Sequence, residues 1–451
     1  MDETNGVWQN WLPDSVFLMW NDARQATAWA FVWLLLVTAG FMLLRRPRPG
    51  GRRWPGWPLI VLAALLVRLP PALWLPLGAT FDIDSYRLVT DALLSGREVY
   101  VAVVGRHPYL PFQMYIMGGM AALANATGLP YVVAIKLPAV LADVALTGLI
   151  YRAVAEDGAG GRRGRDWAAY LALLYALNPV SLLVSSYHGQ FEAITLLLLA
   201  AGLWLYERRR VGASGAAVGL AVLNKTWPVL FLPVILIRLQ SWRSRFGYAA
   251  LALGIPALAV AAYLLAYDAD PMPMLGRALT HRGNPGYWGP SAVLVPAAAL
   301  RPALQPLADA LVAWRNWLLL AAVLLTLWWT QRQSARDAWL TLLLSVFAVT
   351  VGFGIQWLVW LVPFALLAGQ DRWLRLYSLA AALMLTVHLY GLHMVPWLAE
   401  WFSPATTDWL IRLSALPAWG VVVVWLAARL RAARHPVAQA IAPREEVVAE
   451  R

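Results

Sequence analysis

The sequence predicts an all-α, polytopic membrane protein. Hydrophobic residues make up 61% of the 451 residues and charged residues only 13%, whereas about a quarter of a typical soluble chain is charged. The apolar residues gather in runs that approach the roughly 20 residues a helix needs to cross a bilayer, and the arginines gather between the runs. Because the chain has no cysteine, disulfides, thiolate catalysis and cysteine-ligated metal sites are excluded.

The apolar runs predict about 11–13 transmembrane helices. Eleven runs stand at 27–44, 57–77, 131–151, 167–184, 190–206, 247–267, 313–330, 338–353, 356–370, 376–394 and 414–430. Two shorter runs, 212–224 and 226–237, meet at Lys225 and predict a broken pair that leaves and returns to one side of the membrane. Broken helices are tolerated in a membrane only where they line protein or a watery cavity, so we expect a cavity next to Lys225.

The distribution of arginine predicts the orientation. Cytoplasmic loops collect Lys and Arg. One set of segments carries 22 Arg and six acidic residues: 45–53, 152–166, 207–211, 238–246, 331–337, 371–375 and 429–434. The other set carries nine Arg and 13 acidic residues: 1–26, 78–112, 268–315 and 395–413. The first set is therefore predicted inside and the second outside, with the N-terminus out and the C-terminus in. The stretch 112–128 must then lie along the outer interface.

The basic residues also suggest the source membrane. All but two of the 36 are Arg, the exceptions being Lys136 and Lys225, and this usage is typical of a GC-rich bacterial genome. We therefore expect the bacterial cytoplasmic (inner) membrane. The first 26 residues are acidic rather than basic, which argues against a cleaved signal peptide.

Two carboxylates stand in the first large outer loop, at Asp82 and Asp84. At this spacing one can act as a general base while the other orients it or holds a metal ion. An acidic pair at a membrane boundary is, however, more often a solvated helix cap. Spacing alone leaves both interpretations open.

Three further polar residues, His188, Gln190 and Glu192, stand between two apolar runs. A polar turn is expected there in any case, but an acid at the head of an apolar run is costly unless it is paired or hydrated. Lys225 either extends to the membrane surface or holds a phosphate in the expected cavity. The second role is favoured because the neighbouring arginines already specify the orientation.

Other intramembrane charges have simpler interpretations. Lys136 and Asp143 lie seven residues apart on one helical face and are expected to pair. Arg68, near the outer end of its span, either extends outward or serves the site. In the second large outer loop, His281, Arg282 and Trp288 are of the types that hold phosphate or stack on sugars.

The order of these motifs resembles the GT-C superfamily of polyprenyl-phosphate-sugar-dependent glycosyltransferases. The likeness is to the catalytic subunit that adds the first mannose in GPI-anchor synthesis and to the bacterial polyprenyl-phosphate-mannose mannosyltransferases. It spans roughly 78–365 and rests on Asp82-Ile83-Asp84, Thr90-Asp91-Ala92, Gly96-Arg97-Glu98-Val99-Tyr100, His107-Pro108-Tyr109, Leu177-Asn178-Pro179, 185–192, Lys225-Thr226-Trp227-Pro228 and Gln356-Trp357. It implies three parts: an extra N-terminal span and Arg-rich loop (1–53), a GT-C-like catalytic core (54–395), and a last span with a disordered tail (396–451).

The resemblance also implies a reaction. A polyprenyl-phosphate-linked sugar, most simply mannose, moves with inversion to a hydroxyl of a glycolipid, glycan or protein on the extracytoplasmic side, with no role for nucleic acid. Asp82 is the expected base, and Asp84 orients it, binds the acceptor or holds Mg²⁺ or Mn²⁺ if a metal takes part. The donor phosphate and sugar are assigned to Lys225, His281, Arg282, His188, Gln190, Glu192 and Gln356. Acceptor binding or loop support is assigned to Tyr86, Arg87, Arg106, His107, Tyr109 and Trp288.

A second functional class stays open from the sequence alone. A flippase or exporter of a lipid-linked saccharide would also carry a broken helix pair and intramembrane charges. Such a transporter should place polar residues on both halves of its path, whereas the polar residues singled out above fall on the predicted outer half. A purely structural subunit is disfavoured because buried ions are costly.

Overall fold

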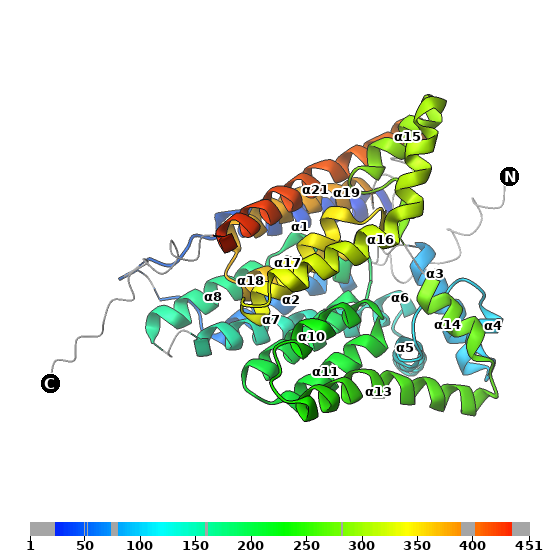
Figure 1. Cartoon of the computed structure of the whole chain (residues 1–451), viewed down its shortest axis with the longest axis horizontal. Helices are drawn as coiled ribbons and strands as arrows, with labels where there is room; N and C mark the ends of the chain where they lie inside the picture. Colours follow the sequence, from blue (N-terminus) through cyan, green and yellow to red (C-terminus); the bar gives the residue numbers. More distant parts are fainter. Residues whose placement is uncertain are drawn as a thin grey trace.

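The computed structural model describes residues 23–48, 50–51, 53–73, 80–157, 161–280, 283–388 and 402–434. These residues are almost entirely helical (Figure 1). The helices are α1 (Ala23–Leu43), α2 (Trp57–Leu73), α3 (Thr80–Leu94), α4 (Val99–Ala102), α5 (Gln113–Thr127), α6 (Tyr131–Ala134), α7 (Leu137–Asp157), α8 (Arg162–Ala176), α9 (Pro179–Leu182), η2 (Leu183–Tyr187), α10 (Glu192–Glu207), α11 (Val211–Asn224), η3 (Trp227–Phe231), α12 (Leu232–Leu236), α13 (Trp242–Tyr267), α14 (Pro271–Thr280), α15 (Ser291–Leu300), η4 (Pro302–Leu304), α16 (Gln305–Trp329), α17 (Ala335–Val349), η5 (Ile355–Val359), α18 (Leu361–Leu367), α19 (Asp371–His388) and α21 (Pro404–Arg434). Two short strands, β1 (Asn284–Pro285) and β2 (Gly352–Phe353), pair antiparallel.

The prediction of an all-α, polytopic membrane protein is confirmed. Within the described residues, four helices are long and apolar enough to cross a bilayer: Tyr131–Asp157, Trp242–Tyr267, Pro302–Trp329 and Pro404–Ala432. A fifth candidate consists of α8 and the α9–η2 segment, which meet at a bend of 41°. Six further apolar helices are 10–17 residues long, and they fall largely on the runs that the sequence predicts as spans.

The bend between α8 and α9 has a local cause. Pro179 lacks an N–H and cannot continue the preceding helix, so a new helix starts there. Asn178 caps it, because its Oδ1 accepts from the N–H groups of Val180 (3.0 Å) and Ser181 (3.3 Å). The turn therefore has a defined geometry, and it carries residues 183–192 back into the bundle.

The seven Arg-rich segments contact one another at one end of the bundle. Arg336 at the start of α17 pairs with Asp157 at the end of α7 and with Glu207 at the end of α10. The other links are Arg46 with Asp371, Arg208 with Glu156, Arg429 with Asp337, Arg162 with the Gly51 carbonyl, and Arg238 with the Thr330 carbonyl. Segments grouped only by their arginine content are thus neighbours in space.

The acidic segments also meet one another. Helix α14, in the segment 268–315, contacts α4, in the segment 78–112, and Arg412 donates to the carbonyl of Gly286. The helices α3, α4, α5 and α14 lie together, away from the start of α8 (Figure 1). In the same view α5 is seen nearly end-on whereas α13 lies in the plane, so α5 runs crosswise to that candidate span, as expected for 112–128.

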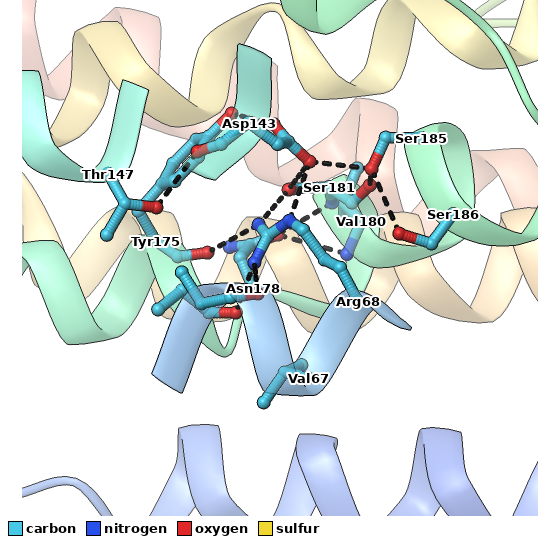
Figure 2. A network of polar contacts seen from close by, with 12 residues as sticks. Val67, Arg68, Asp143, Thr147, Tyr175, Asn178, Val180, Ser181, Ser185 and Ser186 are labelled. Carbon is cyan, nitrogen blue, oxygen red and sulfur yellow. Dashed lines mark hydrogen bonds and ion pairs between the residues drawn. The ribbon is translucent and has the colours of Figure 1, made fainter. Parts of the chain in front are cut away.

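A buried ion pair joins α2 to α7 at the centre of the bundle (Figure 2). Arg68 Nε lies 2.9 Å from Asp143 Oδ2, and the two side chains are 0% and 1% exposed. Arg68 also donates to Ser181 Oγ (2.7 Å) and to the carbonyl of Ala176 (2.9 Å). Asp143 in turn accepts from the hydroxyls of Ser181 (2.8 Å) and Ser185 (2.6 Å).

The expected pairing of Asp143 with Lys136 is replaced by this Arg68 pair. Seven residues span about 10 Å along a helix, and both carboxylate oxygens of Asp143 already accept hydrogen bonds, Oδ2 from Arg68 and Oδ1 from Tyr175. The alternative in which Arg68 extends outward is also wrong, since its guanidinium is directed into the bundle.

Removing one partner of this pair should destabilise the fold strongly. Asp143→Ala leaves the Arg68 charge buried without compensation, which typically costs about 3–5 kcal/mol. The measurement is unfolding of the purified protein in detergent. Arg152→Ala, which removes an exposed pair with Glu156, is the control and should cost less than about 1 kcal/mol. Equal costs for the two variants would contradict this interpretation.

Candidate active site

Asp82 is held by two buried donors from a distant part of the chain. His188 Nε2 and Gln190 Nε2 both lie 2.8 Å from Asp82 Oδ2, and His188 and Gln190 are 2% and 1% exposed. The Asp82 side chain keeps 32% of its surface exposed, and its Oδ1 accepts no hydrogen bond from the residues described. One carboxylate oxygen is therefore anchored and the other remains available.

The surroundings of Asp82 keep it ionised. Burial alone would raise the pKa of its carboxyl, but the hydrogen bonds from His188 and Gln190 and the nearby charge of Lys225 lower that pKa below its usual value of 3.8. Asp82 is thus a carboxylate at neutral pH and can accept a proton.

An irregular turn aims His188 and Gln190 at Asp82. The segment 183–187 is a π-helix, a rare form that is frequent at functional sites, and Gly189 follows with φ +82°. A Cβ at Gly189 would lie 3.2 Å from Lys136 Cγ and 3.3 Å from Ile83 Cδ1. Glycine is thus required by backbone conformation and by space.

Lys225 and Glu192 form a second buried centre. Lys225 caps the end of α11, and its Nζ donates to Glu192 Oε1 at 2.5 Å, while Trp360 Nε1 donates to Glu192 Oε2 at 2.9 Å. The ammonium also lies over the rings of Tyr109 (4.8 Å) and Phe191 (4.6 Å). Glu192 therefore compensates the charge of Lys225.

Aromatic contacts connect the two centres. The Phe191 ring lies 5.2 Å from the ring of Tyr109 and 5.4 Å from that of Tyr86, and Tyr86 stands one helical turn after Asp82. The Tyr86 hydroxyl, His188 Nδ1 and Gln190 Oε1 are buried and have no hydrogen-bond partner among the described residues. Buried polar atoms are rarely left unpaired, so this region is equipped to hold a polar ligand or water.

The cavity expected beside Lys225 is present. Its volume is about 370 Å³, within the range of small-molecule sites. Its polar lining includes Lys225, Gln356, Tyr109, Arg315 and Asn316, and its aromatic lining consists of Trp227, Trp357 and Trp360. Trp227 and Trp360 stack at 3.8 Å and 10°, so the cavity has a flat apolar wall suited to a sugar or an isoprenoid chain.

Asp84 does not join Asp82. The Oδ2 of Asp84 lies 3.5 Å from Arg106 Nη1, and Arg106 in turn lies over the ring of Phe81. Because α3 is a helix, the side chains of residues two apart point in different directions. The sequence predicts a loop here, and a loop would not force Asp82 and Asp84 apart. Among the described residues no group of three His, Asp or Glu could hold a metal ion, so the residues around Asp82 do not fit a resident metal.

The other predicted residues have varied positions. His107 is buried between Tyr100 and Tyr109, and burial lowers its pKa to about 4, so it is neutral at physiological pH. Trp288 is fully buried, stacked on Phe353 and bonded to the Phe347 carbonyl, which is a loop-supporting position outside the cavity. Arg87 is exposed on α3. His281 and Arg282 lie outside the described residues.

Arg315 and Trp227 are among the cavity residues that the sequence did not identify as site residues. Arg315 was counted only among the arginines that specify orientation, and Trp227 only as part of a motif. The signals were present: Arg315 is the third residue of the apolar run 313–330, where a charge is costly unless it is paired or hydrated. The stretch after Lys225 carries a Trp-Pro pair that breaks the helix.

A family model places the chain among known enzymes. The model of Glycosyltransferase family 87 matches residues 114–353, which is just over half of the chain. The chain belongs to glycosyltransferase family 87. Membership implies a GT-C-type membrane glycosyltransferase, in agreement with the broader resemblance stated above. The matched segment contains His188, Glu192 and Lys225 and begins after Asp82.

Gly189→Ala should disable this family 87 protein by misplacing Asp82's donors. The added methyl requires a strained backbone and displaces Lys136 or Ile83, so His188 and Gln190 shift. We expect at least a tenfold loss of sugar transfer, because sub-ångström positioning commonly decides rates of this order. Gly254→Ala, on α13 with nothing within 4 Å, is the matched control and should retain full activity. Equal activity of both variants in a transfer assay, normalised to folded protein, would refute the role of the turn.

Proposed function

We propose that the chain transfers a sugar, most simply mannose, from a polyprenyl-phosphate donor to a hydroxyl of a glycolipid, glycan or protein. The proposal rests on one observation: Asp82, an ionised carboxylate with a free oxygen, lies close enough to Lys225 to feel its charge, and Lys225 lines a cavity of about 370 Å³ that has basic and aromatic walls. Family membership supplies the reaction type, and the site chemistry supports the finer assignment.

The proposed chemistry is a single displacement. Asp82 Oδ1 accepts the proton of the acceptor hydroxyl as the acceptor oxygen bonds to the anomeric carbon, and the bond from that carbon to the phosphate oxygen breaks. Polyprenyl phosphate leaves with the electron pair, and the anomeric centre inverts. His188 and Gln190 hold Oδ2 and thereby orient Oδ1. No step requires a metal ion.

A weak base is sufficient for this reaction. General bases work best with a pKa near the operating pH, and Asp82 lies well below it. A phosphate, however, is a good leaving group, so the anomeric carbon becomes electron-poor early. The acceptor hydroxyl then loses its proton late, when bond formation has already made it acidic.

The site is proposed to face the extracytoplasmic side. Asp82, Lys225 and the cavity belong to the end of the bundle where the acidic segments meet, and the Arg-rich segments meet elsewhere. Under the positive-inside rule the Arg-rich end is cytoplasmic, in a bacterial inner membrane. A polyprenyl-phosphate sugar would then enter from the outer leaflet.

The decisive substitution is Asp82→Asn. It keeps the shape of the side chain but removes the proton acceptor, so transfer from a polyprenyl-phosphate sugar in proteoliposomes should fall at least a hundredfold. Asp91→Asn makes the same change at an exposed position of α3 and should be fully active. Asp84→Asn, which loses only a half-exposed ion pair, should retain most activity. Unchanged transfer by Asp82→Asn would move the base elsewhere.

The pH profile offers an independent check. Because the pKa of Asp82 is lowered, the carboxylate stays charged as pH falls and gains a proton only below the usual Asp pKa of 3.8. The acid limb of kcat/KM should therefore lie below pH ~4, with a flat region from there through neutrality. An acid limb between pH 5 and 7, where an ordinary His titrates, would assign the base to another residue.

A further inference from the structure

The charges around the cavity are unequal. Lys225 and Arg315 are the charged residues among the described groups that line it. Lys225 is already compensated, because Glu192 Oε1 lies 2.5 Å from its ammonium. The described residues give Arg315 no hydrogen bond and no ion pair. Among the described lining residues, the cation that lacks an anion is therefore Arg315 rather than Lys225.

The location of Arg315 makes an idle charge costly. It stands on α16, within the helix Pro302–Trp329, whose 18-residue apolar window is only 6% buried inside the protein. A charge at such a position requires a partner or water. The neighbouring residues Leu318 (39% exposed) and Leu320 (46% exposed) face outward, so the same helix offers one face to lipid and a guanidinium to the cavity.

A second group in the cavity wall also lacks a partner. The Nε1–H of Trp227 is buried and has no hydrogen-bond partner in the part of the chain that the structure describes, although the ring is fixed by stacking on Trp360. Indole N–H groups are donors only, and a buried donor without an acceptor is uncommon. Together, an uncompensated guanidinium and an unpaired N–H match the acceptor oxygens of a phosphate.

We propose that Arg315, assisted by Trp227 Nε1–H, binds the phosphate of the lipid-linked donor in the cavity, while the isoprenoid tail stays in the bilayer beside α16. This inference rests on the proposed function and names the donor-binding residues. Lys225 and Glu192 then act as a neutral pair that shapes the cavity floor. The alternative is that Arg315 merely extends to the membrane surface, and the experiment separates the two.

The test measures equilibrium binding of three probes to the full-length protein in detergent. The probes are a short-chain polyprenyl phosphate, the matching polyprenol and inorganic phosphate. Arg315→Gln should raise the Kd for polyprenyl phosphate roughly 10- to 100-fold and leave the weaker binding of polyprenol unchanged. Arg315→Lys should lie between, and Trp227→Phe, which keeps the ring, should raise the Kd a few-fold. Arg301→Gln, at an exposed cap of α15, is the charge-matched control and should bind as wild type does. Inorganic phosphate should compete only weakly.

The outcomes distinguish the two levels of the proposal. If wild type prefers polyprenyl phosphate to polyprenol and Arg315→Gln keeps that preference, the role of Arg315 is refuted while the proposed function stands. An equal loss of both lipids in Arg315→Gln would show a structural role and refute the phosphate contact. If wild type shows no preference, or if inorganic phosphate competes as well as the lipid, the lipid-phosphate donor itself is refuted, and the inference fails with it.

Discussion

The buried pair of Arg68 and Asp143 is the interaction on which the geometry of the site depends. Two charges are stable in an apolar bundle only if their remaining polar atoms are also satisfied, and Ser181 and Ser185 supply those contacts. Both serines belong to the α9–η2 segment, which leads directly to the donors of Asp82. A charge pair at the centre of the bundle thus fixes the turn that orients the proposed base. Family 87 proteins that lack such a pair would need another anchor for this turn.

Charge compensation shapes the second half of the site. Without Glu192, the Lys225 ammonium would be an uncompensated cation among the rings of Tyr109 and Phe191. With Glu192 it becomes part of a neutral group, which Trp360 completes. This arrangement leaves the cavity weakly polar along its aromatic wall. A sugar that stacks there meets no strong competing charge.

Much of the fold and part of the site could be predicted from the sequence. Apolar runs and arginine counts are properties of whole segments, so the helices predicted from them do not depend on the correct interpretation of any single residue. The cavity beside Lys225 could be predicted because a broken helix and a lysine within a membrane both need a surrounding of protein or water. Pairings were harder: the partner of Asp143 is Arg68, on a helix distant in the sequence, and hydrophobicity does not reveal which helices lie side by side. The separation of Asp84 from Asp82 likewise depends on α3 being a helix, and Arg315 was hidden among arginines that serve orientation.

The proposed reaction moves charge in one direction, and the site is polarised along it. The acceptor proton leaves toward the free oxygen of Asp82, and negative charge develops on the phosphate, which is proposed to lie near Arg315. Preorganised charges that match this movement lower the barrier without reorganisation. The neutral Lys225–Glu192 pair is consistent with this design, because an uncompensated cation near Asp82 would lower its pKa further and make it a weaker base. A strong attraction between Asp82 and the cation that binds the leaving phosphate would also oppose the separation of charge. In the proposed site, Asp82 and Arg315 are kept apart by the Lys225–Glu192 pair and by aromatic rings. This separation avoids both effects.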